Sequence, residues 1–280
     1  MHDAVARRAT VVAVRFMLSR RWLLFAVTVA LLAYGCWWLG EWQFHRLEDR
    51  KERNAITERN LVADPAPVED VLAVGRPVDP EDEWRRVRAE GTYDEDASVV
   101  VRYQTRDGVS GVDVVTPLEL TGTGHLLLVD RGWAATENRG DASPDVPGPP
   151  SGPVTVTGWV RADATGDSTA VDDRSTRAIS SRTIGPTLDG EVLGGFVDLA
   201  TETPEAAEPL AVTETPDLSN GPHFFYGLQW WFFAALAVFG FGYLAYDERR
   251  KLRRPAAGGH DRTDGRAETA AVDAKGAPPS

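Results

Sequence analysis

The side chain best suited to bind a metal lies at the start of a long apolar segment. His223 opens this segment, and Tyr226 and Trp230 follow at positions i+3 and i+7, so the three residues share one face of a predicted helix. Asn220 suits the cap of that helix and Pro222 its first turn. A histidine in the first turn meets the positive end of the helix dipole, which disfavours imidazolium and leaves a neutral nitrogen that can bind a metal. A histidine that only forms a hydrogen bond at an interface fits the sequence equally well.

A second group of side chains follows an earlier apolar segment. Trp42, Arg46 and Arg50 stand four residues apart and therefore share a helical face. A stiff helix with snorkelling arginines is the more frequent structure for such a pattern. A flat aromatic ligand with an iron atom would also match both groups, with His223 as its axial ligand, the Tyr and Trp rings beside it, and Arg46 or Arg50 on its carboxylates. Because the first segment ends where the second begins, we expect the two groups within about two helical turns, ~10 Å, of each other in depth.

Several classes of function lack the residues that they require. The single cysteine, Cys36, excludes an intramolecular disulfide, a CxxC redox site and a c-type haem attachment site. The five histidines lack zinc-binding spacing, and neither a GxSxG motif nor a phosphate-binding glycine loop occurs. We interpret His125 as a surface residue at a strand end rather than a catalytic base, and Asp172 and Asp173 as solvated loop charge. The sequence thus gives little support for an enzyme, and the net charge of −12 disfavours nucleic acid as a partner.

The two apolar segments are the clearest structural feature of the sequence. Residues 22–40 and 223–246 contain no Asp, Glu, Lys or Arg. Each is long enough to cross a bilayer as a helix, since ~20 residues span ~30 Å of hydrocarbon. A cleaved signal peptide is the alternative for residues 22–40, but the apolar core is long and the bulky Trp37 and Trp38 stand where a peptidase needs small residues. The sequence therefore predicts two transmembrane helices.

The distribution of charge predicts the orientation of these helices. Residues 1–40 carry a net charge of +4, residues 41–222 of −18 and residues 223–280 of +2. Bases follow the second segment at once, so its C-terminal end is expected in the cytoplasm, and two spans then place the N-terminus there as well. The predicted order is a cytoplasmic segment (1–21), a transmembrane helix (22–40), an extracytoplasmic domain (41–222), a second transmembrane helix (223–246), and a cytoplasmic tail (247–280) that is first basic and then disordered.

The extracytoplasmic domain is predicted to be α+β and mainly antiparallel β. Residues 41–60 contain neither Gly nor Pro and are rich in helix formers, so the first helix should extend into water. A β-rich part follows at residues 84–199, where short runs rich in Val, Thr, Trp and Tyr end at Gly or Asp. Without a βαβ rhythm, these runs favour an antiparallel sheet or a small barrel.

Five short motifs follow one another along the chain: Gly40, Trp42, Gln43, Arg46 and Leu47; Gly91, Tyr93 and Asp94; Thr116, Pro117 and Leu118; Arg131, Gly132 and Trp133; and His223, Tyr226 and Trp230. In this order they resemble the motifs of the Surfeit-locus family of cytochrome c oxidase assembly factors. Four departures from the family pattern occur: Arg50 stands where Lys is usual, Asp130 where Asn is usual, Asn220-Gly221-Pro222 where Asn-Asn is usual, and Gly227 where Ala is usual. The extra negative charge of Asp130 puts a neutral hydrogen-bonding role at that position in question.

The resemblance implies a bacterial plasma-membrane protein that helps to build haem-A-containing cytochrome c oxidase. Members of the family are expected to bind haem A transiently and to assist its insertion into the catalytic subunit, with haem A synthase as a further potential partner. The histidine that opens the second helix, His223 here, is the haem ligand that the resemblance implies. A scaffold that stabilises oxidase subunits without binding a cofactor remains the alternative, and neither role is enzymatic.

Overall fold

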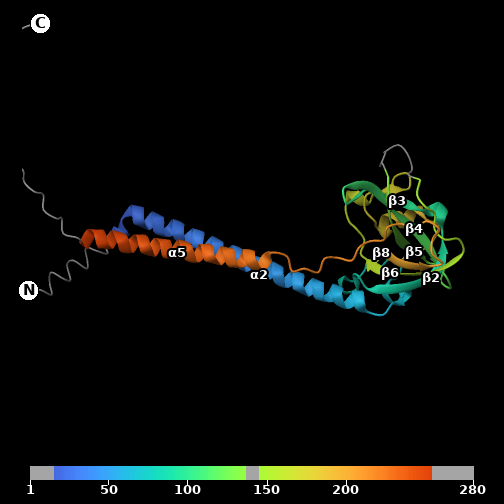
Figure 1. Ribbon diagram of the computed structural model, residues 1–280, viewed down its shortest axis with the longest axis horizontal. Coiled ribbons are helices and arrows are strands. Elements are labelled where there is room, and N and C mark those ends of the chain that lie inside the picture. Colours follow the sequence, from blue (N-terminus) through green and yellow to red (C-terminus); the bar gives the residue numbers. More distant parts are fainter. Residues whose placement is uncertain (1–15, 137–144, 254–280) are drawn as a thin grey trace, which may run out of the picture. The chain divides into compact units, whose positions relative to one another are not determined.

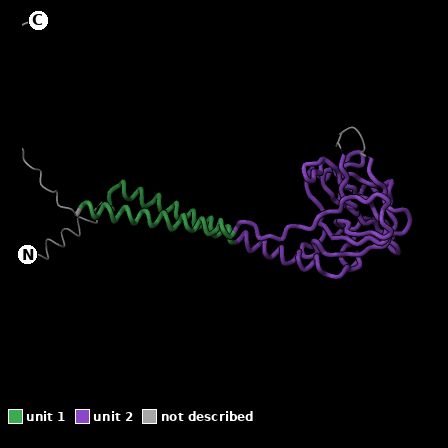
Figure 2. Tube along the Cα trace, in the orientation of Figure 1, with its two compact units in different colours: residues 1–44, 224–280 green, residues 45–223 purple. Residues whose placement is uncertain are grey.

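The computed structural model describes residues 16–136 and 145–253 (Figure 1). The predictions for the first fifteen residues and for a disordered tail beyond residue 253 lie outside these ranges. The chain divides into two compact units, which are described separately: unit 1 comprises residues 1–44 and 224–280, and unit 2 comprises residues 45–223 (Figure 2).

Two long helices form the described part of unit 1 after a short 3-10 turn, η1 (Phe16–Leu18). Helix α2 (Arg20–Val62) continues into unit 2, as the lack of Gly and Pro after Gly40 predicts, and α5 (His223–Arg253) returns. The helices are antiparallel, because Trp22 lies 5.9 Å from Phe241 between ring centroids, and Phe44 lies 6.2 Å from Phe224. Both helices are long and apolar enough to cross a membrane by length and composition.

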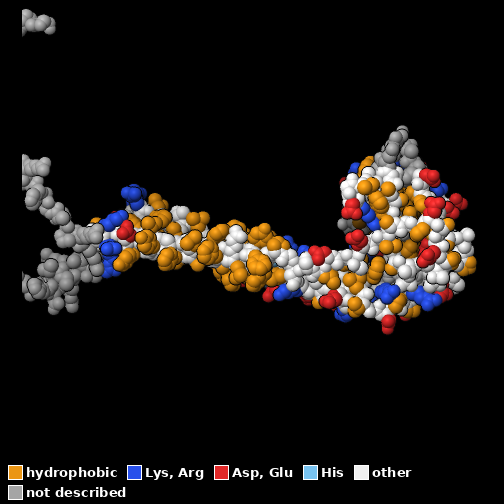
Figure 3. Space-filling view, in the orientation of Figure 1, with side chains coloured by type: hydrophobic (Ala, Val, Ile, Leu, Met, Phe, Trp, Pro, Cys, Tyr) orange, Lys and Arg blue, Asp and Glu red, His pale blue; other side chains and the backbone are white. Residues whose placement is uncertain are grey.

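The surface of unit 1 is apolar along most of its length and basic at one end (Figure 3). Because the helices are antiparallel, the start of α2 and the end of α5 lie at the same end of the pair. The basic residues there are Arg20 and Arg21 on α2, and Arg249, Arg250 and Lys251 on α5.

The described part of unit 2 contains the strands and six short helical turns. The strands are β1 (Ala66–Pro67), β2 (Arg86–Tyr93), β3 (Val99–Arg106), β4 (Val109–Leu120), β5 (Leu126–Ala135), β6 (Pro153–Arg161), β7 (Ser175–Thr176) and β8 (Phe196–Thr203). The turns between them are α3 (Val68–Val71), η2 (Pro80–Asp82), η3 (Glu95–Ala97), η4 (Asp167–Thr169), α4 (Ser181–Ile184) and η5 (Gly185–Thr187), of which α4 and η5 are continuous.

Five of the strands close into a barrel in the order β2-β6-β8-β5-β4, and the pairing of β4 with β2 completes the ring. A Cβ at Gly91 would collide with the backbone oxygen of Glu119, so glycine allows the two strands to meet there. Strand β5 runs parallel to β8 and the other four pairs in the ring are antiparallel. This strand order with one parallel pair is that of the OB-fold, a five-stranded Greek-key barrel.

Two apolar clusters stabilise the barrel. The larger one fills its interior with alternate residues of the strands, such as Val87, Leu118 and Val197, and α3 contributes Val68. The smaller one lies on the outer side of β3, β4 and β5, where Leu128 packs with residues of the segment that precedes β8. Strand β5 is therefore buried on both faces, which explains its continuous apolar run.

The prediction of two apolar helices that flank a mainly antiparallel β domain is confirmed, and of its two alternatives the barrel is the one found. Residues 84–199, predicted to be β-rich, contain β2 to β7 and the start of β8. The parallel β1–β2, β3–β7 and β5–β8 pairs were not predicted. Strand β8 begins at Phe196, directly after Gly195, which has a positive φ of 83°.

Candidate functional site

The part of α2 within unit 2 is tied to the segment that leads into α5, residues 212–222, which we call the return segment. The Nε of Arg50 donates a hydrogen bond to the carbonyl oxygen of Ser219 at 2.6 Å. The Nδ2 of Asn54 donates to the carbonyl oxygens of Leu218 at 2.7 Å and Ser219 at 3.3 Å. The carboxylate of Asp217 accepts from the backbone and hydroxyl of Ser219 and lies 3.9 Å from Arg50 Nη2. Two side chains on adjacent turns of α2 thus hold the backbone that precedes His223.

His223 and Arg50 converge at Gly221. A Cβ at Gly221 would lie 3.7 Å from Nη1 of Arg50 and 3.7 Å from Nε2 of His223. The φ of Gly221 is +63°, a conformation that glycine adopts without strain and that turns the chain into α5. An imidazole and a guanidinium therefore both lie beside Gly221 in unit 2.

The other predicted site residues of α2 are Arg46 and Trp42. Arg46 is exposed on the preceding turn of α2 in unit 2. Trp42 is 43% exposed and belongs to unit 1. It lies two residues from both Gly40 and Phe44, about 200° round the helix, and so on another side of α2 from those two residues.

The helices of unit 1 meet through two glycines. A Cβ at Gly40 would collide with the indole of Trp231, and a Cβ at Gly227 would lie 2.8 Å from the Phe44 ring. Each helix thus presents a glycine to an aromatic ring of the other. The ring centroids of Phe44 and Trp231 are only 4.8 Å apart as a result.

Phe224, Gly227 and Trp231 of α5 pack on α2, and Phe241 does so farther along the pair. Tyr226 is 47% exposed, and the ring of Trp230 packs edge-on against Phe233 of its own helix at 6.0 Å. The structure thus brings Arg50 and His223 together in unit 2, and the aromatic candidates Trp42, Tyr226 and Trp230 belong to unit 1.

His125 occupies a different environment from His223. It lies just before β5, and its Nε2 is 3.5 Å from a carboxylate oxygen of the exposed Glu191. This is the surface position at a strand end that the sequence predicted. Among residues 16–136 and 145–253, no group of three or more His, Cys, Asp or Glu side chains is arranged to hold a metal ion.

The motifs in the barrel have structural roles. The guanidinium of Arg131, 2% exposed, lies 5.8 Å from the centroid of the Tyr93 ring and donates to the carbonyl oxygens of Pro147 and Gly148. Tyr93 in turn donates to Glu202 at 3.0 Å. The Nε1 of Trp133 donates to the backbone of β3. These contacts connect β2 with β8, and β5 with β3 and with the segment before β6.

A buried acidic cluster on the outer side of the barrel was missed in the sequence. Asp113, Asp130 and Asp198 lie on the adjacent strands β4, β5 and β8, and burial raises the pKa of each, most strongly that of Asp130. Arg161 donates to Asp198 at 2.6 Å and Arg106 to Asp113 at 3.0 Å. The signal was present, because each aspartate follows a valine inside an apolar strand, a place where a solvated carboxylate is unexpected.

The residues around Gly221 suit a haem by their donor chemistry. The imidazole of His223 can bind iron, and the Nη1 of Arg50, which also lies beside Gly221, can bind a carboxylate. The remaining nitrogens of Arg50 lie beside Ser219 and Asp217.

A five-stranded barrel joined to two long apolar helices defines the architecture of this chain, and comparison with known proteins identifies its family. Residues 30–235 match the model of the SURF1 family, a range that contains most of the first helix, the barrel and His223. Uncharacterised SURF1-like proteins of Mycobacterium bovis and Mycobacterium tuberculosis are 30% identical over 249 residues, which cover 87% of this chain and 90% of theirs. A SURF1-like protein of Monosiga brevicollis is 33% identical over 126 residues, or 40% of this chain and 43% of its own. The chain belongs to the SURF1 family.

Proposed function

We propose that this protein is a membrane-anchored assembly factor for haem-A-containing cytochrome c oxidase. Membership of the SURF1 family supports a role in oxidase assembly. The catalytic subunit is the expected recipient, and haem A synthase is a potential source of the cofactor. The role is non-enzymatic, because the chain binds and transfers a group without changing its bonds.

The proposed location is the plasma membrane of a bacterium, with α2 and α5 as its two spans. The basic residues of both helices gather at one end of unit 1, which the positive-inside rule assigns to the cytoplasm. The barrel, whose segment carries the net charge of −18, is then extracytoplasmic. Both ends of the described chain face the cytoplasm in this arrangement.

The convergence of His223 and Arg50 at Gly221 is the observation that supports a haem site most directly. His223 would hold the iron through its imidazole, and Arg50 would hold a carboxylate of the macrocycle. Arg46, which lies one turn before Arg50 on α2 in unit 2, is the proposed further contact of the carboxylates. The bound haem supplies no reaction in this role, since the protein protects it and releases it.

The absorption spectrum of the purified protein tests this proposal. Protein purified from cells that make haem A should show a Soret band, and His223→Ala should reduce the band at least about ten-fold because the iron loses its axial nitrogen. His125→Ala is the matched control, since it removes another partly exposed histidine that lies on the barrel surface. A colourless wild-type protein, or a His223→Ala variant with an unchanged spectrum, would contradict haem binding at this site.

A scaffold without a cofactor is the second candidate function. It is favoured by the hydrogen bonds of Arg50 and Asn54 to the return segment, because these also make structural sense in a protein that binds no haem. Under this alternative the protein would co-purify with oxidase subunits, and His223→Ala would leave the amount of assembled oxidase unchanged. Oxidase activity in membranes of the His223→Ala strain therefore separates the two functions.

A further inference from the structure

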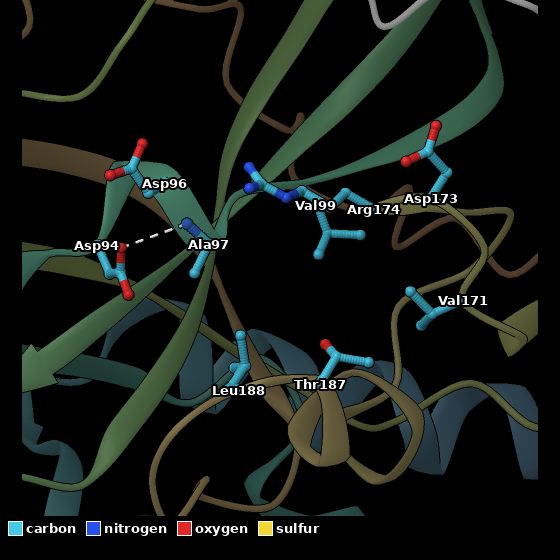
Figure 4. A pocket seen from close by; sticks show the side chains of 9 residues that line it. All are labelled: Asp94, Asp96, Ala97, Val99, Val171, Asp173, Arg174, Thr187 and Leu188. Carbon is cyan, nitrogen blue, oxygen red and sulfur yellow. Dashed lines mark hydrogen bonds between the residues drawn. The ribbon is translucent and has the colours of Figure 1, made fainter.

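A cavity of about 360 Å³ opens on unit 2 between η3, the turn that precedes β7, and η5 (Figure 4). Its volume is at the lower end of the range for ligand pockets, ~300–1,000 Å³, which suits one or two side chains of a partner. None of its lining residues belongs to the proposed haem site.

The floor of this cavity is apolar. Val99 at the start of β3 is 2% exposed and belongs to the smaller apolar cluster, against which Val171 and Leu188 pack. In Figure 4 these side chains point toward the open space, with Leu188 and Thr187 below it. The floor can therefore take the methylene chain of a long side chain.

The rim of the cavity is acidic. Asp94 and Asp96 stand on one side, and Asp173 lies across the opening from them (Figure 4). Arg174 is the only basic residue of the lining. The rim thus carries three carboxylates against one guanidinium, in a domain segment with a net charge of −18.

The rim residues are held by backbone contacts rather than by loose loops. Asp173 and Arg174 have positive φ values of 43° and 55°, and their turn is closed by two hydrogen bonds between Asp172 and Ser175 at 2.8 and 2.9 Å. The carbonyl oxygen of Arg174 also accepts from Val100 on β3 at 2.9 Å. On the other side, Asp94 accepts from the backbone of Ala97 at 3.3 Å and so fixes η3. The cavity is accordingly preformed.

The chemistry of the lining selects one kind of occupant. Three carboxylates repel an anion, and the described carboxylates are not grouped closely enough to hold a metal ion. A purely apolar group would cover the floor and leave the acidic rim without a function. We propose that this cavity docks a segment of a partner protein that bears lysine or arginine beside an apolar residue, with the basic stem on Val171 and Leu188 and its charge at the rim.

Binding of a defined peptide to the full-length protein in detergent tests the proposal. The probe is a fluorescein-labelled peptide with the core Lys-Val-Lys, compared with the same peptide carrying norleucine in place of both lysines. The lysine peptide should bind and the norleucine peptide should bind far more weakly. The double variant Asp96→Asn, Asp173→Asn should weaken binding of the lysine peptide at least about five-fold, since it removes two rim charges without changing side-chain shape.

Two further variants make the result specific. Asparagine tolerates the left-handed backbone conformation of residue 173. Asp107→Asn is the matched control, because Asp107 also has a positive φ, of 50°, and is exposed outside the cavity. Asp107→Asn should leave the affinity within about two-fold, and Arg174→Gln should raise it because a like charge is lost. Equal binding of both peptides, or equal binding by the wild type and the double variant, would overturn the proposal.

Discussion

Asp130 is a carboxyl group in an environment that disfavours charge. It is 4% exposed, and burial together with the neighbouring Asp113 and Asp198 raises its pKa well above the ordinary aspartate value. Its Oδ1 accepts from the backbone of Gly132 at 3.1 Å, a bond that an amide oxygen can also accept. The neutral carboxylic acid favoured here is close in shape and hydrogen bonding to the asparagine that the family motif has at this position.

Asp130→Asn should stabilise the barrel at neutral pH, by at least about 1 kcal/mol, because the amide cannot become a buried charge. Since the folded-state pKa is raised, native protein binds more protons than unfolded protein above the unfolded pKa of ~3.9, and wild-type stability falls as the pH rises from there to the folded pKa. The Asp130→Asn variant should lack the part of this decrease in stability that comes from residue 130. Urea unfolding of the full chain in detergent, followed by tryptophan fluorescence at several pH values, measures both effects.

The exposed Asp107 provides the control for this variant, because Asp107→Asn changes charge without changing burial and should shift stability by less than about 0.5 kcal/mol. If Asp130→Asn is less stable than the wild type at neutral pH, the aspartate is stabilised as an anion and the interpretation is wrong.

Asn54 holds the backbone of the return segment in place and is not proposed to contact a ligand. Its two hydrogen bonds to the return segment are lost in Asn54→Ala, which should cost about 1 kcal/mol and loosen the residues before His223. Hydrogen exchange at residues 217–222 should therefore become faster, while exchange in β4 and β5 stays the same. Glu52→Ala, an exposed change on the same helix, should have no such effect, and unchanged exchange in Asn54→Ala would show that Arg50 alone holds the segment.

At the scale of elements, the pairing of α2 with α5 depends on where side chains are absent. Gly40→Val should separate the helices, because even a Cβ at this position would collide with the Trp231 indole. Cross-linking by a bifunctional maleimide between cysteines placed at Trp22 and Phe241, in a chain with Cys36→Ser, reports the pairing. Gly35→Val on the same helix is the control, since nothing lies within 4 Å of a Cβ there. Cross-linking should fall in Gly40→Val and persist in Gly35→Val; equal yields would disprove the role of this contact.

Local residue patterns predicted the helices and strands well, but they did not predict contacts between segments that are distant in the sequence. The Val-rich runs of β3 to β6 alternate or lie buried on both faces, so their periodicity marks them as strands. The parallel β5–β8 pair joins strands about seventy residues apart and leaves no local signal. For the site, the spacing of Arg46 and Arg50 identified a helical face, but the attachment of Arg50 to Ser219 uses a backbone carbonyl, which no residue pattern encodes.

At the scale of the whole molecule, fold and charge must be read together. OB-folds commonly bind oligonucleotides, yet this barrel belongs to a segment with a net charge of −18, which opposes contact with phosphates. Function therefore follows from the particular residues placed on the fold, not from the barrel itself. An acidic barrel attached to two apolar helices with a basic end instead fits a membrane protein whose basic end faces the cytoplasm, as the positive-inside rule describes.

This arrangement predicts which parts of the chain a reagent can reach from outside the cell. In a Cys36→Ser background, Asp107→Cys on the barrel should react with a membrane-impermeant maleimide in intact spheroplasts, because the proposed orientation places the barrel outside the cytoplasm. Lys251→Cys at the basic end should react only after the membrane is permeabilised, since positive residues favour the cytoplasmic side by the positive-inside rule. Alkaline extraction should leave both variants in the membrane fraction, as two spanning helices resist removal. Labelling of Lys251→Cys in intact spheroplasts with protection of Asp107→Cys would reverse the orientation, and a haem delivered from outside the cytoplasm could then not meet His223 beside the barrel.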